Sequence, residues 1–269
     1  LSNLWRYRDY VIRSFNQDKP FDEFAIEQIA GDEWRPDDPE AMIATGMLRL
    51  GPWGTAMIPK EEARQMYLDD LVHNVGQAFL SMPMRCCKCH DHKFDPIPTR
   101  DYYRLYAALA TTQPAEIDCK FLPEENRAQF ADSRERAEEL LAYAKAKLKE
   151  VNDKQEAAAL AWYEARGLPY KNEKQRRNEP EDSKPPRHVG LTPEDQGRKK
   201  VREQDVWIWE RRLNRYKPMV QSVYSGQMPK FLNSRNLRMP EIDEQWRPET
   251  FILVGGALQA KGDLVQPGV

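Results

Sequence analysis

The chain has 269 residues, of which 31% are charged and 40% hydrophobic, and its formal net charge is only −2. The 41 basic and 43 acidic residues nearly cancel, which argues against a nucleic-acid-binding protein, since such proteins usually carry a basic excess. No apolar run reaches 18 residues, so the sequence predicts no transmembrane segment. The chain does not start with Met and stops without a closing element, which predicts a fragment or processed segment of a longer protein.

Apolar residues recur at helical spacing from the start of the chain, which predicts a series of short helices. The first is expected over residues 4–15 and the second over residues 21–29, where Gly31 should end it. A third short helix is expected over residues 42–48.

The strongest helical pattern covers residues 61–80, and Pro83 should end that helix just before a group of cysteines. After the cysteines, Thr99 is the expected N-cap of another helix that runs through Leu109. The chemistry-bearing residues are therefore expected in the loop between two helices.

A long charged stretch occupies residues 124–217 and predicts an antiparallel helical hairpin. Apolar positions along its first helix alternate in steps of four and three, the pattern of a coiled-coil seam: Ala137, Leu141, Ala144, Leu148, Val151, Gln155, Ala158 and Trp162. Residues 167–190 are polar and rich in proline, so they should form an exposed connector. Thr192 and Pro193 then supply an N-cap and a first-turn proline for the second helix.

The predicted fold is mainly α, with three parts. Residues 1–122 form a helical domain that bears the CxxCH site, and residues 123–218 form the coiled-coil-like hairpin with its connector at about 167–190. Residues 219–269 contain short β-like runs and are expected to begin an incomplete β-containing segment.

A cluster of cysteines and histidines gives the sequence its main chemical feature. Cys86-x-x-Cys89-His90 has the spacing at which haem c is attached. On a helical turn, residues i and i+3 share a face, so both sulfurs can bond the two vinyl groups of one porphyrin. His90 follows one turn after Cys86, where its imidazole can bind the iron as the proximal ligand. The cluster therefore predicts one covalently attached haem c.

Three other interpretations of the cluster stay open. Cys86, Cys89 and His90 or His92 can bind zinc or non-haem iron, although four ligands within seven residues would strain a tetrahedral site. The thiols can also be purely structural. A thiol–disulfide motif is disfavoured, because no βαβ pattern surrounds it.

Other residues are candidates for accessory roles. His73 is ranked first as a distal iron ligand, because it lies on the long helix that precedes the site. His92 and Asp95 can orient a haem propionate or bind a second metal, or they can simply form a turn. Cys87 and Cys119 can form a disulfide or remain free.

Several stretches resemble the planctomycete-type secreted cytochrome proteins of unknown function. The stretches are Cys89-His90-Asp91-His92-Lys93-Phe94-Asp95-Pro96-Ile97, Asp101-Tyr102-Tyr103, Asp18-Lys19-Pro20-Phe21-Asp22-Glu23-Phe24, Glu27-Gln28-Ile29-Ala30-Gly31-Asp32 and, more weakly, residues 255–269. The resemblance covers most of residues 4–112, and the charged hairpin is an insertion in it. Cys87 departs from the family's pattern, which usually has a small residue there. The resemblance implies secretion to the periplasm or cell exterior and a haem-linked setting.

Three functions are consistent with these features. The first is electron transfer or redox chemistry with one haem c, with a redox partner protein or other domains of a longer parent chain as partners. The second is a metal-dependent secreted enzyme that uses the Cys/His/Asp cluster. The third is a structural subunit in which residues 124–217 dock another protein.

Overall fold

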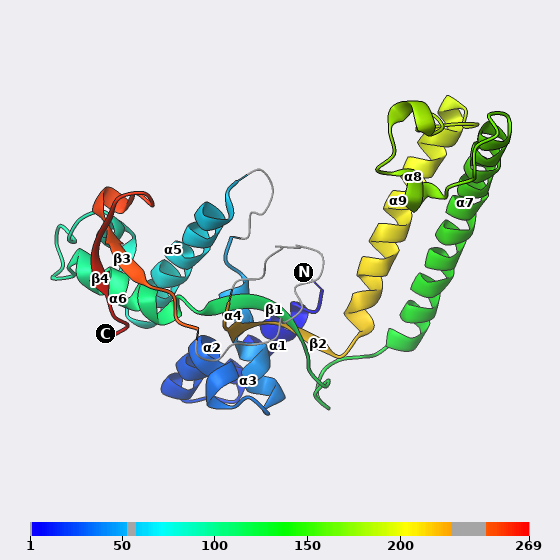
Figure 1. Ribbon diagram of the computed structural model, residues 1–269. Helices are drawn as coiled ribbons and strands as arrows, with labels where there is room; N and C mark the ends of the chain where they lie inside the picture. The colour runs from blue at the N-terminus through cyan, green and yellow to red at the C-terminus, as the bar shows by residue number, and fades with distance from the viewer. Residues whose placement is uncertain (1, 53–57, 228–245, 269) are drawn as a thin grey trace. The chain divides into compact units, whose positions relative to one another are not determined.

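The computed structural model describes residues 2–52, 58–227 and 246–268 (Figure 1). The fold is mainly helical, as the sequence predicts, and the described residues also form two small sheets. Contacts divide the chain into two units. Unit 1 comprises Leu1–Glu125 and Pro218–Val269, and unit 2 comprises Asn126–Lys217. Within the described part of the chain, no helix combines the length and apolar character needed to cross a membrane.

Short helices make up most of unit 1. They are α1 (Trp5–Asn16), α2 (Phe21–Trp34), α3 (Pro39–Ala44), α4 (Gly46–Arg49), α5 (Lys60–Phe79), the 3₁₀ turn η1 (Met84–Lys88) and α6 (Thr99–Leu109). The helix expected over residues 42–48 is instead two short helices, α3 and α4, which meet at Thr45.

Gly31 does not end the second helix, contrary to the sequence-based expectation. The helix α2 bends at Ala30, whose φ is −143°, and continues to Trp34. A side chain at Gly31 would collide with the backbone carbonyl of Ala41 in α3. The glycine therefore allows two helices to pack closely rather than stopping one of them.

Two antiparallel strand pairs complete unit 1. The strand β1 (Thr112–Asp118) pairs with β2 (Met219–Ser225), with Ala115 opposite Ser222. The strand β3 (Thr250–Leu253) pairs with β4 (Lys261–Val265) and packs on α6. The sequence did not predict β1 and treated residues 219–269 as the start of a separate segment. The structure places that segment in unit 1, because the backbone groups of β2 find their partners on β1.

The main core of unit 1 forms where α5, η1 and α6 meet the C-terminal strands. Its buried members include Tyr67, Leu71, Val72, Val75, Met84, Cys87, Tyr102, Tyr103, Val223 and Leu253. A smaller cluster around Tyr10, Ile43 and Val220 joins α1 and α3 to β2. Each cluster unites residues that lie far apart in the chain, and the main core includes Met84 and Cys87 of the turn that carries Cys86 and Cys89.

Arg6 of α1 is fully buried and ties α1 to the segments that lead into and out of unit 2. Its Nε donates to Glu125 Oε1 at 2.6 Å, and its other nitrogens donate to the backbone carbonyls of Cys119, Lys120 and Met219. Glu125 Oε2 also accepts from the backbone N–H of Leu122 at 2.8 Å. The buried charges are thus both paired and hydrogen-bonded, the condition under which burial of charge is tolerated.

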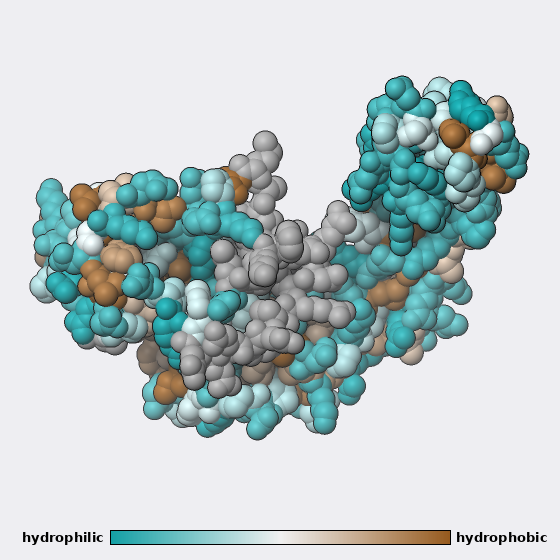
Figure 2. Space-filling view, in the orientation of Figure 1, coloured by the Kyte–Doolittle hydropathy of each residue, from teal (hydrophilic) through white to brown (hydrophobic). Residues whose placement is uncertain are grey.

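Unit 2 is built on two long helices, α7 (Phe130–Glu164) and α9 (Pro193–Leu213), that pack side by side. Lys145 pairs with Glu210 and Lys154 with Asp195, so the helices run antiparallel. α9 begins with the expected cap: Thr192 and Asp195 form a reciprocal capping box, and Pro193 occupies the first turn. The visible face of this unit is mostly hydrophilic (Figure 2).

The predicted seam of α7 is its least exposed face. Its residues are buried or half-buried, and Ala159 and Tyr163 are buried beside them. No residue of α9 is buried. The connector between the helices contains α8 (Glu173–Arg176) and the 3₁₀ turn η2 (Glu181–Ser183). It is not wholly exposed as expected, because Arg176 and Pro185 are buried, and Arg176 binds Glu156 of α7.

Candidate functional site

The Cys86–His90 segment lies at the end of η1, a 3₁₀ turn in which residues i and i+3 point to the same side. Met84 and Cys87 share the buried side, at 5% and 0% exposure. Cys86 and Cys89 are exposed, and the backbone N–H of Cys89 donates to the carbonyl of Cys86 at 3.2 Å. The turn therefore presents two thiols together and sends the third into the core.

Cys87 is a core residue rather than part of the exposed pair. Its Sγ lies 3.7 Å from the carbonyl oxygen of Ile97, and burial raises the pKa of its thiol. Burial likewise raises the pKa of Cys119. All four cysteines are free, so Cys87 and Cys119 do not form a disulfide in this structure.

His90 is exposed, and one of its ring nitrogens is engaged. Nδ1 lies 2.7 Å from the backbone carbonyl oxygen of Asp91. In the tautomer that donates this hydrogen bond, Nε2 keeps a free lone pair, which is the form in which histidine binds a metal. The Asp91 carbonyl therefore engages one ring nitrogen of His90 and, in this tautomer, leaves Nε2 without a proton.

His92 and Asp95 close the loop that follows His90. His92 Nδ1 accepts a hydrogen bond from the Asp95 backbone N–H at 3.0 Å, and the Asp95 carboxylate lies at the same distance. The His92 backbone N–H donates to the Ile97 carbonyl at 2.9 Å. These contacts match the turn role that the sequence left open for the two residues.

Asp91 links this loop to the start of α6. Its Oδ1 accepts a hydrogen bond from the backbone N–H of Thr99 at 2.7 Å. Thr99 was expected to be the N-cap of the helix, but Thr99 is its first residue and its side chain makes no cap bond. The cap is supplied from eight residues earlier, which a search for local capping patterns cannot detect.

Tyr103 and Asp69 contact Lys88 in the turn, and Tyr102 in turn holds Asp69. Tyr103 donates to the Lys88 carbonyl at 2.9 Å, Tyr102 donates to Asp69 Oδ1 at 2.6 Å, and the Lys88 ammonium pairs with Asp69 Oδ2. Burial, reinforced by Asp69, raises the pKa of Tyr102. The sequence alone did not predict these hydrogen bonds, although Tyr102 and Tyr103 lie in a stretch that carries the family resemblance.

The turn between β3 and β4 brings the backbone of Gly256 next to Cys89. Gly256, in the 3₁₀ turn η4 (Val254–Gly256), has a φ of +73°, and a Cβ built on it would lie 2.7 Å from Cys89 Sγ. Gln65 of α5 donates to the Gly256 carbonyl at 3.4 Å. Glycine is required here both by the backbone conformation and by the space that Cys89 occupies.

His73, the expected distal ligand, lies on α5. Its Nδ1 is buried and has no hydrogen-bond partner among the described residues. No hydrogen bond or ion pair joins it to the described residues of the turn. Across residues 2–52, 58–227 and 246–268, no three His, Cys, Asp or Glu side chains are grouped so as to hold a metal ion.

A second group of charged residues lies around Tyr67 in unit 1, and the sequence gave no sign of it. Arg49 is only 3% exposed, and its Nε finds no partner in the described structure. Arg64 donates to the Ala110 carbonyl at 2.9 Å, while its second terminal nitrogen is buried without a partner among these residues. Burial lowers the pKa of both guanidinium groups. Burial and the nearby Glu33 raise the pKa of Asp32 to about 6.

One family model matches the first part of the chain. Residues 1–114 match the model described as "PSCyt2: Protein of unknown function (DUF1549)", a planctomycete-type domain of unknown function. The match includes the turn, the loop that follows it and α6, and it confirms the expected resemblance at that level. None of the curated proteins and none of the solved structures matches the chain.

Proposed function

We propose that the turn carries one covalent haem c, with Cys86 and Cys89 as the thioether donors and His90 as the proximal ligand, and that the protein serves electron transfer or redox chemistry. The observation that carries this proposal is that two free and exposed thiols stand three residues apart, Cys86 in the 3₁₀ turn and Cys89 at its C-cap, a spacing that 3₁₀ geometry places on one side. His90 follows directly, with Nδ1 engaged by a carbonyl.

The residues around the turn fit such a group. Cys87 is fully buried, which supports Cys86 and Cys89 as the two thioether donors among the three neighbouring cysteines. The absence of a side chain at Gly256 leaves room for the sulfur of Cys89, which a Cβ there would approach to 2.7 Å. Bound haem would supply an iron centre that exchanges single electrons.

The chain's own residues would set the geometry of the site. Tyr103 and the Lys88–Asp69 pair fix the turn, and Asp91 ties the following loop to α6. The Asp91 carbonyl would hold His90 in one tautomer and raise its basicity. Because the turn and the loop are held in place, they would move little when the charge of a bound iron changes on electron transfer.

The proposal includes a secreted location, in the periplasm or outside the cell, because haem c attachment and the family resemblance both belong to that setting. The partner would be a redox protein or another domain of a longer parent chain. The alternatives are a zinc or non-haem iron site at the same residues and a docking role for residues 124–217.

Haem retention in cysteine variants tests the proposal. Protein produced in its native host should stay coloured after acid–acetone extraction, because thioether bonds survive that treatment, and a pyridine haemochrome assay should identify c-type haem. Cys86→Ala combined with Cys89→Ala should abolish the retained colour. His90→Ala should change the spectrum of the iron while leaving the haem attached.

Cys87→Ala is the matched control, since it removes a neighbouring thiol that points into the core. It should retain the haem, and far-ultraviolet circular dichroism should show that it folds. A colourless wild-type protein, or stoichiometric zinc or iron without haem, would contradict the proposal.

A further inference from the structure

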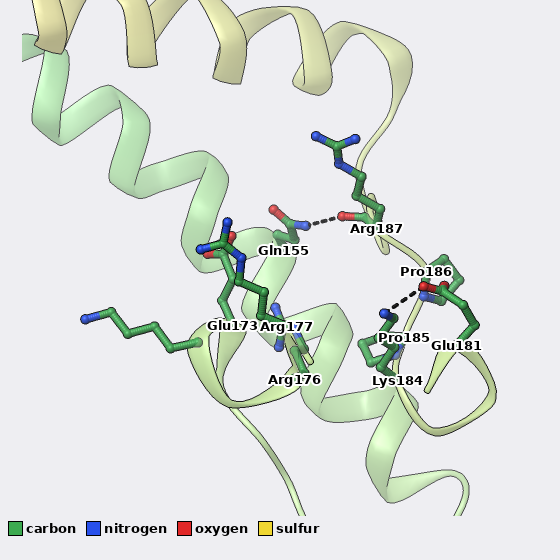
Figure 3. Close-up of a pocket in the computed structure, with 10 residues that line it drawn as sticks. Gln155, Glu173, Arg176, Arg177, Glu181, Lys184, Pro185, Pro186 and Arg187 are labelled. Carbon is green, nitrogen blue, oxygen red and sulfur yellow. Dashed lines mark hydrogen bonds and ion pairs between the residues drawn. The ribbon is translucent and has the colours of Figure 1, made fainter. Parts of the chain in front are cut away.

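Unit 2 contains a cavity of about 720 Å³ between α7 and the connector (Figure 3). Gln155 of α7 contributes to its wall, and the rest comes from connector residues between Glu173 and Arg187. A volume of this size lies in the range of sites for small molecules, and it is much larger than one water molecule or one simple oxyanion.

The cavity has fixed walls in spite of the polar sequence that forms them. Arg176 is 8% exposed and binds Glu156 through two hydrogen bonds, at 2.5 and 3.1 Å. Gln155 donates to the Arg187 carbonyl at 2.7 Å and accepts from Lys199 at 2.8 Å, so both ends of its amide are held. Figure 3 shows the hydrogen bond between Gln155 and the Arg187 carbonyl, together with the ion pair between Lys184 and Glu181.

The end of the connector also packs tightly on α7. Gly190 has a φ of +70°, and a side chain there would collide with the Cβ of Ala158. Pro185 and Pro186 contribute an apolar part of the wall and restrict the backbone. The connector is therefore held against α7 at several points, and these contacts define the wall of the cavity.

The charges that line the cavity do not cancel. Five lining side chains are basic and two are acidic. Arg176 is neutralised by Glu156, and Lys184 is neutralised by Glu181. The other three, Lys174, Arg177 and Arg187, form no side-chain hydrogen bond or ion pair with the residues that the structure describes. Against them stands one acidic lining residue, Glu173, so the cavity is positively charged.

From this arrangement we infer that the cavity is a binding site for a small ligand with two or more anionic groups, held by Arg177 and Arg187. Guanidinium groups bind planar or tetrahedral oxyanions through paired N–H donors, and the unpaired state of these two leaves the donors available. The amide of Gln155 is held in the same wall, and the prolines provide an apolar contact for the body of the ligand. This site is independent of the proposed haem.

Isothermal titration calorimetry on the full chain at low ionic strength tests the inference. The probes are sodium pyrophosphate and trisodium citrate, which distinguish phosphate from carboxylate ligands, and sodium sulfate, which has a single anionic group, is the control that should bind more weakly. At least one probe should bind saturably. The combined change Arg177→Ala and Arg187→Ala should weaken that binding at least about tenfold, because each hydrogen bond to a charged group is worth at least one such factor.

The combined change Lys200→Ala and Arg215→Ala is the matched control. It removes the same charge from exposed positions of unit 2 that do not line the cavity. It should change the affinity less than threefold, and circular dichroism should show that both variants keep their helices. The inference is overturned if no probe binds saturably, if the arginine variant binds like the wild type, or if the control loses affinity to the same extent.

Discussion

Unit 1 joins residues that lie far apart in the chain, whereas unit 2 pairs two long helices joined by one connector. In unit 1, β1 pairs with a strand more than a hundred residues later, and Arg6 binds Glu125. Both members of that ion pair are nearly inaccessible to water, with side-chain exposures of 1% and 0%. Unit 1 therefore depends on a few buried contacts that cannot be replaced by solvent.

Unit 2 depends on many exposed contacts instead. Lys145 and Glu210 are each 53% exposed, and the pairs along α7 join residues three or four apart. Such pairs contribute only about 0.3–0.5 kcal/mol each. Its buried residues on α7 are few, three of the five are alanines, and α9 contributes none.

A site with fixed geometry requires buried contacts that hold its backbone in place. The candidate haem turn lies in unit 1, where buried tyrosines and an ion pair fix the backbone beneath exposed thiols. In unit 2 a fixed site is found only where the connector brings buried bonds of its own, at Arg176 and Gln155. The two units should therefore differ in how much stability they lose when a charged contact is changed.

The largest effect is expected when the buried ion pair of unit 1 is broken. Glu125→Gln leaves the Arg6 guanidinium buried without a counter-charge, which should lower the free energy of unfolding by about 3–5 kcal/mol. Native-state hydrogen exchange should show the loss of protection in peptides of α1, β1 and β2. The matched change Glu210→Gln, in an exposed pair of unit 2, should cost no more than about 1 kcal/mol. Equal losses for the two variants would contradict the contrast between the units.

Asp32 of unit 1 should give an intermediate effect with a defined pH dependence. Its folded-state pKa of about 6 lies above the ordinary value of 3.8, so the folded state favours the protonated form. The charged form therefore destabilises unit 1 increasingly as the pH rises from about 4 to 6. Asp32→Asn should stabilise the protein at pH 7.5 by on the order of 2 kcal/mol, with no difference near pH 3.5. Denaturant unfolding at both pH values measures this, and a variant that is less stable at pH 7.5 would refute it.

Asp195 of unit 2 should show the opposite sign and the smallest effect. Lys154 and the N–H and hydroxyl groups of Thr192 lower its pKa to about 2, so the folded state favours the charged form. Its contribution is present above pH 3.8 and is lost as the pH falls toward 2. Asp195→Asn should slightly increase hydrogen exchange in the first turn of α9 at pH 7, and the two proteins should converge at low pH. Increased exchange that persists unchanged at pH 2 would argue against this assignment.

The same contrast explains what the sequence could predict. The helices α5, α7 and α9 follow from periodicity, and the N-cap and first-turn proline of α9 were visible as Thr192-Pro193. The strand β1 was missed because Thr112–Asp118 includes a proline and has a weak strand pattern. It becomes a strand only through its pairing with β2.

Part of the candidate site was also readable. The spacing of Cys86, Cys89 and His90 identified the residues, but it did not show that Cys87 turns into the core, because that depends on contacts with Met84 and Ile97. The approach of Gly256 to Cys89 and the cap of α6 by Asp91 arise from packing between distant segments. Local patterns carry no information about either contact.

The intact mass of the protein isolated from its native host tests the central claim most directly. The wild-type chain should exceed its sequence mass by that of one haem, and Cys87→Ala should keep this increment. Cys86→Ala combined with Cys89→Ala should lose it under the same denaturing conditions, because no thioether remains. A wild-type chain at its unmodified mass, or a double variant that retains the increment, would contradict the assignment of the turn as a haem c site.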